Sequence, residues 1–158
     1  MKTLKKIVLP VLGLFVIFSA CKKSSSTPAV QDVYTKTGLL VNTSQEVPAV
    51  TNSNATGTMD VTYVKSTKLL TYKVNWMNLS DSITQSHIHG TAPRGVMTGV
   101  KVPFDLGNKG ALSGTYTGKF TVDGTTVKED SLLAGFYYLN IHTKKNPNGE
   151  VRGQIEFK

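Results

Sequence analysis

The feature that most constrains the fold is a strict alternation of apolar and polar residues in several short segments. In the segment 70–76 (LTYKVNW) every second residue is apolar, and the segments 58–63 (TMDVTY) and 150–157 (EVRGQIEF) have the same period of two. Successive side chains of a β-strand point to opposite faces, so this pattern predicts strands that bury one face. Trp76 lies on the apolar side of its segment, and we expect it in the core.

Further strands are predicted where β-branched and aromatic residues gather, over residues 38–42, 83–89, 100–104, 112–120 and 136–142. Turn-forming pairs such as Gly107-Asn108 and Asp123-Gly124 separate them. One short helix is expected at 126–134, where Gly135 would end it. About eight short strands predict an all-β domain over residues 34–158, folded as an antiparallel Greek-key β-sandwich or flattened barrel.

The first twenty residues have the composition of a secretion signal. Residues 1–6 carry three lysines and no acid, and fourteen uncharged residues follow them up to Ala20. A membrane-spanning helix needs about 20 apolar residues, whereas the apolar part of a signal peptide needs about 7–15. The length therefore favours a signal peptide over residues 1–20.

Cys21 follows this segment directly, in the sequence FSAC. Small residues before a cysteine resemble the processing site of bacterial lipoproteins, in which the cysteine becomes the lipidated N-terminus. We therefore expect Cys21 to carry acyl chains such as palmitate, residues 21–33 to form a Ser-rich tether, and the protein to lie outside the cytoplasm on the outer membrane. The alternative is an ordinary signal peptide followed by an incidental cysteine.

Charge and cysteine content exclude several classes of protein. The formal charge is +8, and it becomes +5 once the three lysines of the signal segment are removed. The remaining basic residues are scattered and do not form a stripe with aromatic residues, so we do not expect a nucleic-acid partner. A single cysteine allows no intrachain disulfide and no CxxC metal or redox motif.

The chemistry-bearing residues are three histidines: His87, His89 and His142. Residues i and i+2 of a strand share a face and lie about 6.6 Å apart, so His87 and His89 can converge on one ion. His142 lies in another predicted strand and could complete a three-imidazole site. Imidazole suits copper, zinc, iron or nickel, and three histidines with an open position are typical of reactive metal sites. The alternative is that each histidine forms hydrogen bonds that hold loops in place.

The parity of these residues predicts that they lie outside the main core, on a sheet face or under a covering loop. Ile88 has the apolar parity of its segment, which turns His87 and His89 to the other face. His142 and Arg152 also have the polar parity of their segments. A single turn, 144–149, joins these last two segments, so we expect a hairpin with His142 and Arg152 almost opposite each other, and Arg152 near enough to guide an anion.

Other catalytic arrangements are absent from the sequence. There is no GxSxG motif around a serine, and none of the acidic residues Glu46, Asp60, Asp81, Asp105 and Glu150 is paired with another in the sequence. We expect acidic residues such as Glu46 and Glu150 to be solvated or to cap turns.

Three blocks of residues resemble the CHRD domain, a module named from chordin and found in many bacterial secreted proteins. The sequence QEVPAV at 45–50, followed by Ala55-Thr56-Gly57, is similar to the family's opening EVPPV…A.G. The segment 86–90 (SHIHG), with Gly95 and Gly99, resembles its HIHxG…G…G block. The segment 138–154 resembles its closing YxNxHT…NPxGExRGQ block. The departures are Ala49, which replaces a second proline, and Thr43, where a glycine is common. The resemblance covers residues 34–158 and implies an extracytoplasmic β-domain.

The order of the histidines also resembles that of copper-zinc superoxide dismutases. These enzymes bind copper through an HxH pair and a distant histidine and keep an arginine nearby. The matching positions here are His87, His89, His142 and Arg152. The chain has no further histidine for a bridging or zinc ligand and no cysteine pair, so the resemblance extends to a copper site and to a superoxide-dismutase-like sandwich only.

Two functions follow from these features. The first is a membrane-anchored, non-enzymatic lipoprotein whose β-sandwich is a binding or structural module. The second is a copper-binding domain that uses the three histidines, with zinc as the less favoured ion. In the extreme form of this hypothesis the bound metal has redox or dismutase-like chemistry. Convergence of the three imidazoles on one point separates the two.

Overall fold

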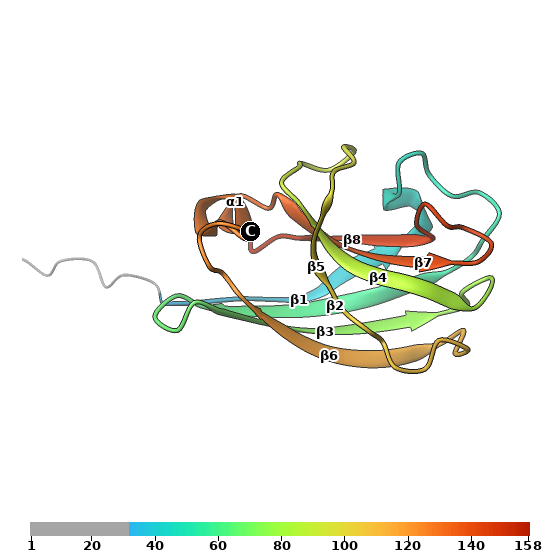
Figure 1. Cartoon of the computed structure of the whole chain (residues 1–158), viewed down its shortest axis with the longest axis horizontal. Helices are drawn as coiled ribbons and strands as arrows, with labels where there is room; N and C mark the ends of the chain where they lie inside the picture. The colour runs from blue at the N-terminus through green and yellow to red at the C-terminus, as the bar shows by residue number, and fades with distance from the viewer. Residues whose placement is uncertain (1–31) are drawn as a thin grey trace, which may run out of the picture. The chain divides into compact units, whose positions relative to one another are not determined.

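The computed structural model describes residues 32–158, and nearly all regular structure in this part is β-strand (Figure 1). The strands are β1 (Val33–Asn42), β2 (Thr56–Val64), β3 (Leu69–Met77), β4 (Ile83–Gly90), β5 (Val100–Pro103), β6 (Gly114–Thr121), β7 (Tyr137–Thr143) and β8 (Val151–Ile155). Within residues 32–158 the helical elements are the 3-10 turn η1 (Thr43–Gln45) and the one-turn helix α1 (Glu129–Leu133). The predicted all-β class is confirmed.

The eight strands form one antiparallel sheet in the order β5-β4-β7-β8-β1-β2-β3-β6. The sheet curls so that β1, β2, β3 and β6 lie on one side and β4, β5, β7 and β8 on the other, which gives a flattened, nearly closed barrel (Figure 1). Strands β3 and β4 follow each other in the chain but lie in different halves, as in a Greek-key connection. This arrangement places the two histidine-bearing strands, β4 and β7, side by side.

The core between the halves follows the predicted alternation. In β3 the side chains of Leu70, Tyr72, Val74 and Trp76 are buried, whereas Thr71 and Lys73 are exposed. Tyr72 also contacts the rings of three neighbouring aromatic residues: Phe104, Tyr116 and Phe120. The apolar residues of β2 are buried in the same way.

Two elements differ in extent from the sequence-based expectation. Strand β1 begins at Val33 rather than at Gly38, because a register shift between Lys36 and Leu39 interrupts its alternation. Gly38 lies at this shift with φ of 68°, a left-handed conformation that suits glycine. Helix α1 is shorter than 126–134, although Gly135 follows it as expected.

Strands β7 and β8 are buried on both faces, so of the two expected positions of the polar face, open on the sheet or under a covering loop, the second is found. Every residue of both strands is buried, including Arg152 and Gln154 on the polar parity. The parity itself is as predicted, but three connections cover the polar face: residues 43–55, 91–99 and 144–149. Hydrogen bonds from β7 and β8 to Ala92, Pro93 and Pro147 fasten two of these connections. The same strands therefore have an apolar layer inside the barrel and a polar layer beneath the loops.

Some expectations lie outside the described residues. The signal peptide, Cys21 and nearly all of the tether fall in residues 1–31. Within residues 32–158, no helix has the length and apolar character needed to cross a membrane.

Candidate metal centre

The pairing of β4 with β7 brings the three histidines to one face of the sheet. In this register His87 lies opposite Asn140 and His89 opposite Tyr138, while His142 lies opposite Gln85. The three imidazoles thus occupy adjacent positions on two neighbouring strands, and the Ile88 side chain points into the core on the other face.

The imidazole rings converge. One candidate ligand nitrogen from each of the three histidines lies within 4.8 Å of the others. The Nδ1 atom of His87 is 3.2 Å from the Nε2 atom of His142. Two nitrogens on one tetrahedral ion with bonds of 2.0–2.1 Å are about 3.3 Å apart, so this pair already has the required spacing. The candidate nitrogens that are farthest apart, at most 4.8 Å, would have to approach by up to about 1.5 Å to reach the same spacing.

Backbone carbonyl groups fix the tautomers of two rings. His89 Nδ1 donates to the Thr98 carbonyl oxygen at 2.8 Å, and His142 Nδ1 donates to the Pro147 carbonyl oxygen at 2.9 Å. A carbonyl oxygen only accepts, so the proton of each neutral ring lies on Nδ1 and the lone pair lies on Nε2. Histidines that bind metals usually donate their other ring nitrogen to an acceptor of this kind. His87 Nδ1 donates to His142 Nε2, and moving its proton to Nε2 would free Nδ1 as a ligand.

The free nitrogen of His89 is buried without a partner. Its Nε2 atom is one of three buried side-chain atoms between residues 32 and 158 that have no hydrogen-bond partner, and the His89 side chain is only 8% exposed. A buried polar atom without a partner costs about 1–3 kcal/mol, so such atoms call for a physical explanation. A metal ion that accepts this lone pair would provide one.

The electrostatics keep the rings neutral. Burial, together with the neighbouring His142 and His89 rings, lowers the pKa of His87 to about 4. Burial also lowers the pKa of His89 and of His142, against the opposing effect of their carbonyl partners. Neutral imidazole is the form that binds metals, so at pH 7 no proton has to be removed from these rings first.

Tyr138 and Arg152 support the site from the side. The Tyr138 ring stacks on His89, with centroids 4.9 Å apart and planes 6° apart, and the Arg152 guanidinium carbon lies 3.5 Å from the centre of the same ring. Arg152 Nη1 donates to the Val96 carbonyl and Nη2 to the Pro93 carbonyl and the Gln154 side chain. In the β7–β8 hairpin Arg152 lies opposite Asn140, whereas we expected it almost opposite His142. The register differs because Val151 pairs with Ile141 and not with His142.

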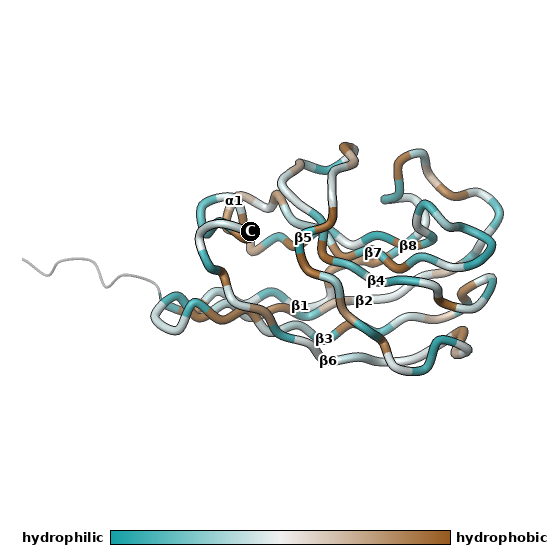
Figure 2. The backbone as a smooth tube through the Cα atoms, in the orientation of Figure 1, coloured by the Kyte–Doolittle hydropathy of each residue, from teal (hydrophilic) through white to brown (hydrophobic). Residues whose placement is uncertain are grey.

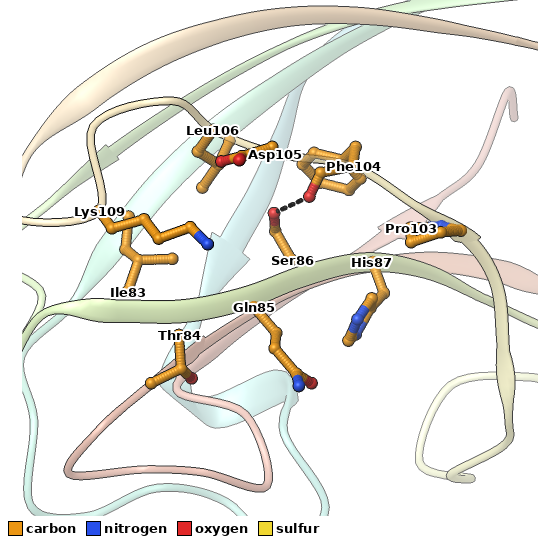
Figure 3. Close-up of a pocket in the computed structure, with 10 residues that line it drawn as sticks. All are labelled: Ile83, Thr84, Gln85, Ser86, His87, Pro103, Phe104, Asp105, Leu106 and Lys109. Carbon is orange, nitrogen blue, oxygen red and sulfur yellow. Dashed lines mark hydrogen bonds between the residues drawn. The ribbon is translucent and has the colours of Figure 1, made fainter.

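Solvent reaches the site from the side of His87, which is half-buried, whereas His89 and His142 are buried. A hollow of about 400 Å³ includes His87 in its lining. Figure 3 shows His87 and Gln85 pointing to one side of β4, while Ser86 points to the other and donates to the Phe104 carbonyl. The hollow is therefore lined by side chains from both sides of β4, and His87 is the member of the histidine cluster in its lining.

Sequence reasoning missed several residues of the covered polar layer. Glu46 and Glu150, which we expected to be solvated, are buried. Glu150 accepts hydrogen bonds from the Ser53 and Thr143 hydroxyls and from the Ser80 backbone NH, and so ties three segments together. These acidic residues, with Asn140 and Gln154, lie in the sequence blocks that resemble a known family. For Asn140, Glu150 and Gln154 the polar parity shared with His142 and Arg152 was the available signal, whereas Glu46 lies in a loop and has no strand parity.

The comparisons with known proteins agree with the fold and with the position of these blocks. No curated protein matches the chain, and no solved structure matches it. The family model of the CHRD domain matches residues 39–155, which include every strand from β2 to β8 and all three histidines. The chain therefore belongs to the CHRD domain family.

Proposed function

We propose that this CHRD domain is a metal-binding module that holds one copper ion through His87, His89 and His142. The observation that carries the proposal is the buried His89 Nε2 lone pair, which has no partner, on a ring whose other nitrogen is fixed by the Thr98 carbonyl. The convergence of the three rings within 4.8 Å supports it further.

The donor set favours copper over zinc. Nitrogen sites bind divalent metals with affinities that rise to Cu²⁺ and fall again at Zn²⁺. No carboxylate or thiolate joins the three imidazoles among the described residues, and three protein ligands leave a position open for a small exogenous ligand. A bound copper ion would supply one-electron redox chemistry there. Tyr138 and the loop 91–99 hold the His89 ring and limit access by water from that side.

Calorimetric titration tests the proposal. Protein purified without a histidine tag should bind one equivalent of Cu(II) at pH 7 and should bind Zn(II) more weakly. The absence of a binding heat for both ions would contradict the proposal, and the histidines would then serve to hold the loops through Thr98 and Pro147.

The same proposal places the module at the bacterial cell envelope, anchored through Cys21. Its support is the sequence FSAC after an uncharged segment of signal-peptide length, followed by a Ser-rich stretch before β1. Two or more acyl chains hold a protein stably on a membrane, whereas one chain gives only marginal binding. The tether would let the domain stand away from the surface.

Replacement of Cys21 tests the anchor. Cells that express Cys21→Ser should release the protein without detergent, because the thiol that carries the lipid is lost. Metabolic labelling with a palmitate analogue measures lipidation directly and should be lost as well. If the variant remains in the membrane fraction like the parent protein, the anchor lies elsewhere.

A further inference from the structure

A second feature of the covered polar layer involves Glu46 and Asn140. Glu46 follows η1 in the 43–55 segment, and Asn140 lies on β7 opposite His87. The Asn140 amide nitrogen donates to Glu46 Oε2 at 3.4 Å. Glu46 is 7% exposed and Asn140 is 3% exposed.

Each side chain keeps one oxygen without a partner. Glu46 Oε1 and Asn140 Oδ1 are the other two buried side-chain atoms of residues 32–158 that lack a hydrogen bond. Both oxygens lie against Gly149, since a β-carbon there would be 2.7 Å from each of them. Two acceptors side by side with no donor between them are unfavourable, so a donor is missing from this arrangement.

A proton is the donor that fits. Both oxygens are inaccessible to solvent, so a ligand in the neighbouring hollow between residues 46–52 and 145–149 does not reach them. A metal cation would lie in the field of Arg152, which already acts on Glu46. A proton on Glu46 Oε1 would donate to Asn140 Oδ1 and leave the existing hydrogen bond in place.

We propose that Glu46 is protonated at mildly acidic pH and that its carboxylic acid and the Asn140 amide then form a cyclic pair with two hydrogen bonds. This pair latches the 43–55 segment onto β7 beside the histidines, and loss of the proton opens the latch. The latch depends on Glu46 and Asn140 alone and does not require a bound metal.

The surrounding charges are consistent with this state. Burial raises the pKa of Glu46 to about 7, against the opposing effects of Arg152 and of the Asn140 hydrogen bond. The other cations that line the two hollows at Glu46 are Arg94 and Lys145. Arg94 is paired with Glu156, and Lys145 donates to the Asn52 carbonyl, so neither forms a hydrogen bond with Glu46.

The direction of the pH effect follows from the raised pKa. A carboxyl group with a higher pKa in the folded state than in the unfolded state stabilises the fold fully below its unfolded value, about 4.5. This contribution is lost as the pH rises through about 7. The 43–55 segment should therefore be held most tightly at mildly acidic pH.

Urea unfolding of the full chain between pH 5.5 and 8.5 tests the latch with Glu46→Gln. A glutamine amide donates to Asn140 Oδ1 at every pH and keeps both hydrogen bonds. We expect the variant to match the parent protein near pH 5.5 and to have a folded-to-unfolded ratio at least about tenfold higher at pH 8.5. The matched control is Glu150→Gln, a buried carboxylate that already has donors. Its difference from the parent should stay constant, because burial raises the pKa of Glu150 but the hydrogen bonds from Ser53, Thr143 and Ser80 outweigh burial and leave that pKa lowered.

Carbon-13 NMR of labelled glutamate in the parent protein gives a second readout that needs no variant. The Glu46 carboxyl resonance should titrate near pH 7, and amide exchange of residues 46–52, relative to that of residues 91–99, should quicken above that pH. A Glu46 carboxyl that titrates below pH 5 overturns the proposal. So does a constant difference between Glu46→Gln and the parent across the pH range.

Discussion

Substitution of His89 by alanine should weaken copper binding by at least about 100-fold. Loss of a residue that only forms a hydrogen bond to a metal ligand typically lowers metal affinity about 10–100-fold, and loss of the ligand itself costs more. His89 holds the one imidazole nitrogen that is buried and unpaired, so its loss removes the best-prepared ligand. Calorimetry of the variant and of the parent protein measures the effect.

The same substitution should also lower stability, by about 1–3 kcal/mol, because it removes both the hydrogen bond from His89 to the Thr98 carbonyl and the stacking of His89 on Tyr138. This differs from the expectation for a histidine on an open face, since His89 is covered by the loop 91–99 and stacks on Tyr138. Thr84→Ala, at an exposed position of the same strand, is the control and should change neither quantity. Unchanged copper affinity in a folded His89→Ala protein would contradict the assigned ligand set.

Substitution of Arg152 by alanine should destabilise the domain by about 3–5 kcal/mol, because it removes three hydrogen bonds from a charged donor and the contact with the Tyr138 ring. The side chain is 1% exposed and donates to the Pro93 and Val96 carbonyls and to Gln154. Its removal takes a donor from each of these acceptors, and of the three only the Pro93 carbonyl keeps another from within residues 32–158, the Val96 backbone NH. Urea unfolding monitored by the single tryptophan, Trp76, measures the change.

Arg94→Ala provides the comparison for this prediction. Arg94 lies on the same loop and pairs with Glu156, but both side chains are largely in contact with solvent, so the loss should be under about 1 kcal/mol. Hydrogen exchange adds a local readout, because residues 91–99 should exchange faster in Arg152→Ala than in Arg94→Ala. Equal stability of the two variants would mean that Arg152 does not fasten this loop.

The strands and the core could be predicted from the sequence because alternation is a local property. The parity of the segment 70–76 alone identified which side chains of β3 are buried. The HxH spacing and the parity of His142 likewise predicted that the three rings share a face, which the β4–β7 register shows.

The cover of the polar face could not be predicted in the same way. The acceptors that orient His89 and His142 are backbone carbonyls of Thr98 and Pro147, and any residue type provides such a carbonyl. The path of a loop depends on tertiary contacts, so parity separated the core face from the other face but did not reveal that the other face is buried. Glu46 shows the consequence, because a lone acidic residue in a loop is most often solvated.

The most direct test of the central claim is an X-ray absorption spectrum of the copper complex at pH 7, prepared with one equivalent of Cu(II) and freed of unbound metal. The account predicts scattering from three imidazole rings with copper–nitrogen distances of about 2.0 Å. Copper that is lost during gel filtration, or a spectrum with a single imidazole, would contradict a site built from His87, His89 and His142.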